Sequence, residues 1–194
     1  LESNSALNVW AIKDNNTWIT MTNCQFIQNH ATYTGGASIG ALDIFNSTFF
    51  ENNANQGGAL YESYVINSTF FRNHATSIGG AIYGYVSLKS TFVDNTAPIA
   101  GAIYHSQSYS NLISGEYPQC GELYTYYESM PPSMTDTFCH ENYILVDDLR
   151  LGEFDGRIVP LLANSPTIDA DPCRASVFNI DQLGTLRPQG NACD

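Results

Sequence analysis

The sequence predicts an all-β protein, a right-handed, single-stranded parallel β-helix with coils of about 22 residues. One phrase recurs four times between Asn23 and Tyr104, and in each copy a β-prone run precedes a small polar turn and a corner of the Gly-Gly-Ala type. An asparagine follows each run, with spacings of 23, 21 and 22 residues between Asn29, Asn52, Asn73 and Asn95. Such a period indicates a solenoid, in which one small unit is stacked on the next.

Leucine-rich repeats also have periods near this length. Their pattern needs several leucines per repeat, whereas these copies contain Phe, Ile, Tyr, Gly and Ala and hardly any Leu. The composition therefore favours a β-helix. Because one coil cannot bury its own inner face, neighbouring coils must stack at about 4.8 Å, the spacing of adjacent strands. We expect about eight coils over the chain, including irregular ones.

Stacking predicts that equivalent residues form ladders. We expect an inward aromatic ladder, an asparagine ladder at a turn and a glycine corner where backbones approach closely. The members are Phe26, Phe49, Phe70 and Phe92, then Asn29, Asn52, Asn73 and Asn95, then Gly36, Gly58, Gly80 and Gly101. Each coil needs these residues for its architecture, so the repeat by itself indicates no active site.

The chain is expected to form one β-helix domain over residues 1–194. Residues 1–22 are interpreted as an irregular first coil or cap, and 23–104 as the regular coils. Residues 105–142, which are rich in Tyr and Ser and contain two cysteines, are interpreted as a disulfide-stapled insertion. Residues 143–194 are expected to supply closing coils and a C-terminal motif.

Seven basic and 19 acidic residues give a formal net charge of −12, which disfavours binding to nucleic acid or anionic lipid. The absence of an apolar run near 18 residues predicts no membrane insertion. An acidic surface tolerates cations, and calcium is a candidate at Asp147, Asp148, Glu153 and Asp155, although a solvated acidic turn is the favoured interpretation. The chain begins without Met, so we interpret it as part of a longer precursor.

Five cysteines predict an oxidising, extracellular or cell-surface location. Their order suggests pairs Cys120–Cys139 and Cys173–Cys193, but four cysteines allow three pairings. Cys24 replaces the serine found in the other copies and is interpreted as a buried free thiol.

Aromatic residues are the candidate binding residues. Tyr61, Tyr83 and Tyr104 share one repeat position, and Phe50 and Phe71 form a second ladder beside the inward phenylalanines. Some of these rings either lie beneath the insertion or form an exposed stripe for carbohydrate or for another subunit. Asn15, Asn46 and Asn67 match the N-glycosylation pattern, although Asn-Ser-Thr in the repeat is also a plausible turn and strand entry.

The repeated phrase, FxxNxAxxGGAIY, resembles the coils of bacterial surface β-helix proteins, including polymorphic outer-membrane proteins. The tail segments NSPTIDA (164–170) and DQLGTLRPQGNACD (181–194) resemble the choice-of-anchor Q domain. That resemblance implies a secreted or surface-anchored β-helix whose tail closes the solenoid, and it implies no reaction.

We therefore expect an extracellular structural or cell-surface protein that self-associates, as a homo-oligomer, a filament or a matrix, and we assign no catalytic residue or cofactor. A carbohydrate-binding or adhesin module is the first alternative, and a polysaccharide lyase or hydrolase is the second. Catalysis would need several converging carboxylates. At one repeat position the sequence has Gln28, Glu51, Arg72 and Asp94, whose alternating character instead favours pairing between stacked coils.

Overall fold

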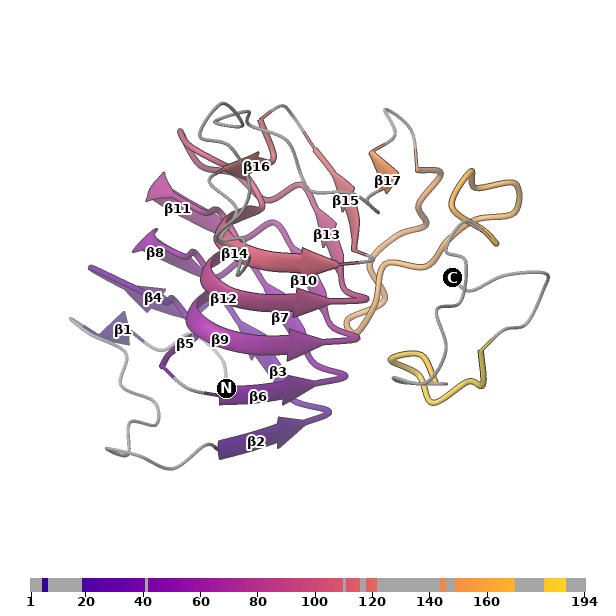
Figure 1. Ribbon diagram of the computed structural model, residues 1–194, viewed down its shortest axis with the longest axis horizontal. Helices are drawn as coiled ribbons and strands as arrows, with labels where there is room; N and C mark the ends of the chain where they lie inside the picture. The colour runs from indigo at the N-terminus through magenta and orange to yellow at the C-terminus, as the bar shows by residue number, and fades with distance from the viewer. Residues whose placement is uncertain are drawn as a thin grey trace, which may run out of the picture.

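The computed structural model describes residues 5–6, 19–40, 42–109, 111–115, 118–121, 144–145, 149–169 and 180–187. In this part the chain forms an all-β solenoid of parallel strands without a helix, with a spacing of about 22 residues (Figure 1). The predicted fold class is therefore confirmed. The expected number of coils is wrong, since the described residues form about four regular turns instead of about eight.

Three parallel sheets, here named A, B and C, form the sides of the solenoid. Sheet A contains β3 (Gln25–Ile27), β7 (Thr48–Phe50), β10 (Thr69–Phe71), β13 (Thr91–Val93), β15 (Leu112–Ser114) and β17 (Ile144–Leu145). Sheet B contains β1 (Ser5–Ala6), β4 (His30–Ala31), β8 (Asn53–Gln56) and β11 (His74–Ile78). Sheet C contains β2 (Ile19–Thr22), β6 (Leu42–Phe45), β9 (Leu60–Ile66), β12 (Ile82–Leu88), β14 (Ile103–Tyr109) and β16 (Cys120–Gly121), with β5 (Ser38–Ile39) beside β9.

The strand register follows the sequence repeat. In sheet A, Phe70 pairs with Phe49 on one side and with Phe92 on the other. The rings of Phe26, Phe49, Phe70 and Phe92 stack inside the solenoid, with successive centroids 4.8, 4.6 and 4.7 Å apart. All four side chains are buried. The predicted inward aromatic ladder is therefore present and forms the centre of the core.

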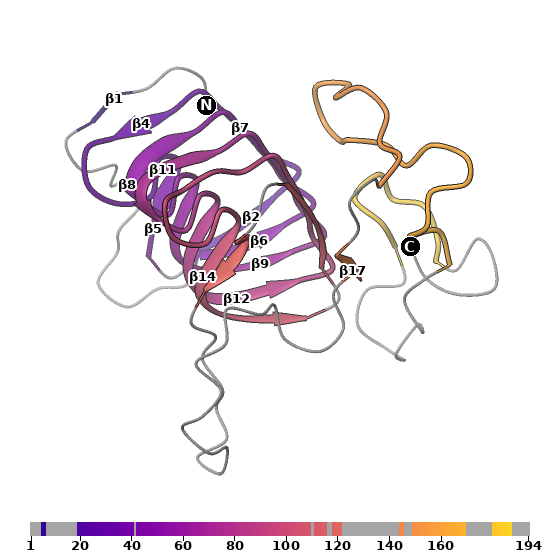
Figure 2. The same ribbon diagram turned by 90° about the horizontal axis from the view of Figure 1, so that it is seen from above.

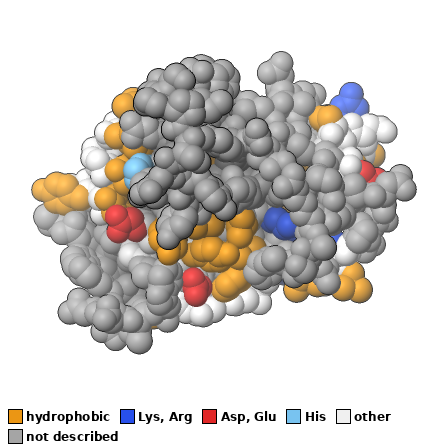
Figure 3. Space-filling model, viewed as in Figure 1, with side chains coloured by type: hydrophobic (Ala, Val, Ile, Leu, Met, Phe, Trp, Pro, Cys, Tyr) orange, Lys and Arg blue, Asp and Glu red, His pale blue; other side chains and the backbone are white. Residues whose placement is uncertain are grey.

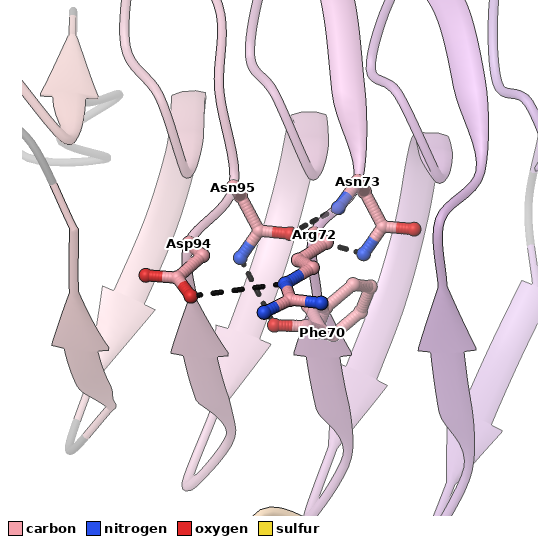
Figure 4. Close-up of polar contacts among 5 residues, drawn as sticks. All are labelled: Phe70, Arg72, Asn73, Asp94 and Asn95. Atoms are coloured by element: carbon pink, nitrogen blue, oxygen red, sulfur yellow. Dashed lines mark hydrogen bonds and ion pairs between the residues drawn. The ribbon is translucent and has the colours of Figure 1, made fainter. Parts of the chain in front are cut away.

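The asparagine ladder closes the turn between sheets A and B. The Oδ1 atom of Asn73 accepts hydrogen bonds from both the backbone N–H and the Nδ2 of Asn52, at 3.0 and 2.9 Å. Its Nδ2 donates to the Phe49 carbonyl at 2.9 Å. The same Nδ2 donates to the Oδ1 of Asn95 at 3.0 Å (Figure 4). One side chain thus makes four hydrogen bonds to the neighbouring coils while it is fully buried.

A second polar ladder, which sequence analysis missed, closes the turn between sheets C and A. The hydroxyl of Ser68 accepts from the backbone N–H of Ser47, and the hydroxyl of Ser90 accepts from that of Ser68, both at 3.1 Å. Asn111 continues the ladder by accepting from the N–H of Ser90 at 2.8 Å. Cys24 occupies the serine position at the other end and is a free thiol, as predicted, although it is only half-buried.

The glycine corner joins sheets B and C. A Cβ atom on Gly58 would overlap the carbonyl oxygen of Gly80 in the next coil, and one on Gly80 would overlap that of Gly101. These positions therefore need glycine because the backbones touch, as predicted. The preceding residue, Gly57, has a φ of +60°. Just before this corner β11 bulges relative to β8, with a register shift between Ala75 and Ile78.

After β17 the described chain leaves the stack. Residues 149–169 and 180–187 lie beside sheet A (Figures 1 and 2), and their bridges Leu151–Leu161 and Ile180–Leu186 are antiparallel. We name these two described stretches the C-terminal strap. Only β17, within the range expected to form closing coils, adds a strand to the parallel sheets in the described part of the chain.

The asparagine ladder predicts a large effect of Asn73→Ala. The substitution removes four hydrogen bonds and leaves buried donors and acceptors of Asn52, Asn95 and Phe49 without partners. We expect it to lower the free energy of unfolding by about 2–4 kcal/mol, measured by urea denaturation. Asn55→Ala, whose amide donates only to Thr76 at the surface, is the matched control and should cost less than about 1 kcal/mol. Equal losses in the two variants would contradict this account.

The glycine corner predicts that Gly58→Ala prevents folding of the native stack. Its Cβ atom would meet only backbone, the carbonyl groups of Gly80 and His74, which cannot move without separating two coils. Circular dichroism and thermal melting of the purified chain would measure the loss. Gly101→Ala is the milder comparison and should cost less, because a Cβ atom there meets the end of the Gln119 side chain at 2.8 Å and one backbone oxygen, of Asn95, at 2.9 Å. A native melting curve for Gly58→Ala would contradict the close-packed corner.

Candidate functional site

The outer face of sheet C presents a column of tyrosines. In β9, β12 and β14 the first residue points into the core, and Leu60, Ile82 and Ile103 are fully buried. The residue that follows must therefore point outward. These outward residues are Tyr61, Tyr83 and Tyr104, which pair in register and are each half-buried. We name them the tyrosine ladder.

The tyrosine rings stack on one another along the solenoid. The centroids of Tyr61 and Tyr83 are 4.8 Å apart with nearly parallel planes, and those of Tyr83 and Tyr104 are 5.4 Å apart and tilted. Burial, followed by the Glu62 carboxylate and by Tyr83, raises the pKa of Tyr61. The predicted line of Tyr61, Tyr83 and Tyr104 is thus one continuous surface feature.

The residue after each tyrosine has a left-handed backbone. The φ angles are +55° at Glu62, +84° at Gly84 and +51° at His105. This local bulge leaves two successive residues on the outer side and turns the next position inward, where Ser63 and Ser106 are fully buried. Glu62 and His105 therefore form a second column beside the tyrosine ladder, and Gly84, which lies between them, is buried.

Tyr85 departs from this pattern. It pairs with Ser63 and Ser106 in register, but its side chain is 50% exposed and its φ is +77°. A bulky residue with positive φ is unusual in proteins. Burial, then Asp43, then Tyr85 raise the pKa of the neighbouring Tyr64. Hydrophobic side chains gather on the surface over β9 and β12 (Figure 3).

The other predicted binding residues, Phe50 and Phe71, lie elsewhere. Both belong to sheet A, where their rings are 5.5 Å apart, and Phe154 of the strap packs on them at 4.7 and 5.2 Å. Phe71 is only 8% exposed. The structure therefore does not join them to the tyrosine ladder, and the strap covers them.

A cleft of about 700 Å³ lies where the strap leaves this part of sheet A. Its polar residues include Arg72, Asp94, Arg150 and Glu153. The Nε atom of Arg72 lies 4.0 Å from a carboxylate oxygen of Asp94 (Figure 4). Its guanidinium lies 4.6 Å from the centre of the Phe71 ring. In the previous coils Gln28 donates to Glu51 at 2.9 Å. The repeat position occupied by Gln28, Glu51, Arg72 and Asp94 thus forms two surface pairs between stacked coils.

Gln182 fixes the strap to sheet A. Its Oε1 accepts from the hydroxyl of Thr69 at 2.7 Å, and its Nε2 donates to the hydroxyl of Thr48 at 3.0 Å. The guanidinium of Arg157 donates to the Gln182 carbonyl at 2.8 Å. Gln182 is buried, so these bonds are shielded from water. Sequence analysis did not find this residue, because nothing near it repeats.

Asn67 also holds the strap. Its Oδ1 accepts from Arg187 at 3.0 Å, and its Nδ2 donates to the Ile180 carbonyl at 2.9 Å. The side chain is only 3% exposed. As a glycosylation acceptor, Asn67 would have to lose both contacts, so its environment favours the turn interpretation. Asn46 is half-buried at the equivalent turn, and Asn15 lies outside the described residues.

The cysteine pairings stay predictions. Cys120 is buried and disulfide-bonded. Cys139, Cys173 and Cys193 lie outside the described residues, so neither the Cys120–Cys139 nor the Cys173–Cys193 pairing is visible.

Calcium binding also stays a prediction. Asp147 and Asp148 lie outside the described residues. Asp155 caps a turn, and hydrogen bonds from the backbone N–H groups of Ile158 and Arg157 lower its pKa. In the part of the chain that the structure describes, no group of three or more His, Cys, Asp or Glu side chains could hold a metal ion.

Comparison with known families gives one match. Residues 67–85, which include β10, β11 and the start of β12, match the Chlamydia polymorphic membrane protein repeat. The match covers a single coil, so it shows a likeness of the repeat. Searches of curated proteins and of solved structures each found no match. The tail's resemblance to the choice-of-anchor Q domain stays a prediction. The described residues contain no helix long and apolar enough to span a membrane.

The contacts of Gln182 predict that Gln182→Ala loosens the strap. The variant loses the bonds to Thr48 and Thr69 while the core ladders are unchanged. In hydrogen exchange measured by mass spectrometry, the backbone amides of 180–187 should exchange at least about tenfold faster. A tenfold change needs the free energy of local opening to fall by only about 1.4 kcal/mol. Leu183→Ala, at a side chain that is 49% exposed, should exchange like the unmodified protein. Unchanged exchange in Gln182→Ala would contradict the assigned role.

Proposed function

We propose that this chain is part of a cell-surface β-helix protein that acts through contact, with the outer face of sheet C as its contact surface. The single observation that supports the contact role is the tyrosine ladder. The inner phenylalanines and the turn asparagines account for coil stacking, whereas Tyr61, Tyr83 and Tyr104 point away from the core. Tyrosine is enriched among the residues that dominate protein interfaces.

The surface location rests on two supports. The matched repeat belongs by its description to a membrane protein family of Chlamydia. The cysteine content and the acidic charge of −12 are compatible with an extracellular environment. Self-assembly into a filament or a matrix belongs to the same proposal, and it would bring the contact surfaces of many copies together.

Carbohydrate binding by the tyrosine ladder is the alternative proposal. Sugars stack on the open face of an aromatic ring, but within the ladder each ring face is turned towards the next ring at 4.8–5.4 Å. The ladder mainly offers ring edges and hydroxyls, a geometry that favours a protein partner. A glycan array would test the alternative, and turnover of polysaccharides would test the lyase or hydrolase proposal.

Two measurements test the proposed function. Antibodies against the folded chain should label intact producing cells as strongly as permeabilised cells, and labelling only after permeabilisation would contradict a surface location.

Beads coated with the protein should be captured by cells that display it, and Tyr83→Ser should reduce capture at least about fivefold if Tyr83 is an interface anchor. Tyr33→Ser, at a 54% exposed tyrosine outside sheet C, is the control. Equal capture by both variants would contradict the contact surface.

A further inference from the structure

We propose that the outer face of sheet C binds the same face of a second copy. The two copies are related by a twofold axis that lies between the faces and runs parallel to β12. This inference rests on the proposed function, because it takes the same face as the contact surface and names its partner. Its evidence is the spacing of the tyrosine ladder and the order of charged groups in the column beside it.

The spacing of the ladder matches another parallel β-face. Tyr61, Tyr83 and Tyr104 present ring edges at intervals of 4.8 and 5.4 Å, close to the strand spacing of any parallel sheet. A partner whose side chains repeat at the same interval can meet every ring in the same way. A second copy of this chain has the same interval because it has the same coils.

A twofold axis along β12 keeps the columns aligned and reverses the order of the coils. Tyr83 then meets Tyr83 of the second copy, and Tyr61 meets its Tyr104. In the neighbouring column, Glu62 of one copy meets His105 of the other, and this pair occurs twice in the dimer.

The charges in that column distinguish this arrangement from its alternative. Glu62 is exposed, and His105 is partly exposed with its ring 6.1 Å from that of Tyr83. The twofold arrangement places a carboxylate opposite an imidazole, whose N–H can donate to it. Two copies with the same coil order would instead place Glu62 opposite Glu62, which is repulsive.

The central position of the column is occupied by a buried glycine. Gly84 lies between Glu62 and His105 on successive coils, at the centre of the twofold arrangement. Its φ of +84° favours glycine, and the nearest atom to a Cβ there would be Cγ of Glu62, at 3.4 Å.

The size of the face predicts a weak dimer. Seven residues of β9 extend about 23 Å, and the six strands of sheet C span about 24 Å, so two faces bury roughly 1,100 Å². That area is at the lower end for specific complexes, and each copy has a charge of −12. We therefore expect dissociation constants in the micromolar range at 0.15 M salt, where long-range repulsion is screened.

Sedimentation velocity of the full chain tests the inference, at pH 7 in 0.15 M NaCl and from about 1 to 300 μM, a range that brackets micromolar affinity. The 21.3-kDa chain should form dimers as its concentration rises. Glu62→Arg and His105→Glu should each weaken the dimer about tenfold, and the double variant should recover at least the original affinity. Glu153→Arg changes the net charge as Glu62→Arg does but lies on the sheet A side, so it should have little effect.

Three outcomes would overturn the inference. The first is a monomer at every concentration, which would mean that the face is covered within the chain or kept for another partner. The second is a dimer that resists both charge reversals, and the third is a double variant weaker than either single variant. Circular dichroism confirms that each variant is folded. If the chain is a monomer but antibodies still label intact cells, only the copy–copy contact is refuted. If the chain forms a charge-dependent dimer but antibodies label cells only after permeabilisation, only the surface location is refuted.

Discussion

The structure depends on the requirement that each coil repeat the one below it at the strand spacing. The buried turn asparagines enforce this requirement, because one amide both accepts from and donates to neighbouring coils. A coil displaced by even one residue would lose these bonds and would also break the phenylalanine stack. The glycine corner is a consequence of the same constraint, since only glycine lets adjacent backbones touch there.

Residues that repeat in every coil could be predicted from the sequence. Phe70, Asn73 and Gly80 were assigned correctly to the core, the turn and the corner because stacking imposes the same environment on each copy. The serine ladder was equally visible, but Asn-Ser-Thr was interpreted only as a glycosylation pattern or as a turn and strand entry, and no ladder was predicted there. Its hydroxyls lie at a turn whose hydrogen bonds depend on the coil next to it.

Residues outside the repeat could not be predicted in the same way. The estimate of about eight coils assumed that the whole chain winds, whereas the strap turns back onto sheet A through Gln182 and Phe154. Nothing in the local sequence of Gln182 indicates Thr48 and Thr69 as partners, because they lie more than a hundred residues earlier. The candidate site shows the same limit. The tyrosine line was predicted, but the covering of Phe50 and Phe71 was not, and it separates the two groups of aromatics.

The bulge between β8 and β11 has a consequence for how such a chain changes its length. The distance from the stacked phenylalanine to the turn asparagine is three residues in every coil, from Phe26 to Asn29 and from Phe70 to Asn73. From the asparagine to the corner glycine it alternates between seven residues, as in Asn73 to Gly80, and six, as in Asn52 to Gly58. Changes in coil length are thus absorbed repeatedly along sheet B and once along sheet C, where 13 residues separate Gly36 from Phe49 and 12 separate Gly58 from Phe70. Only the side from the phenylalanine to the asparagine keeps its length in every coil. Sheet B, whose length varies most often, is therefore a side on which foreign peptide loops could be grafted into this solenoid without disturbing its ladders.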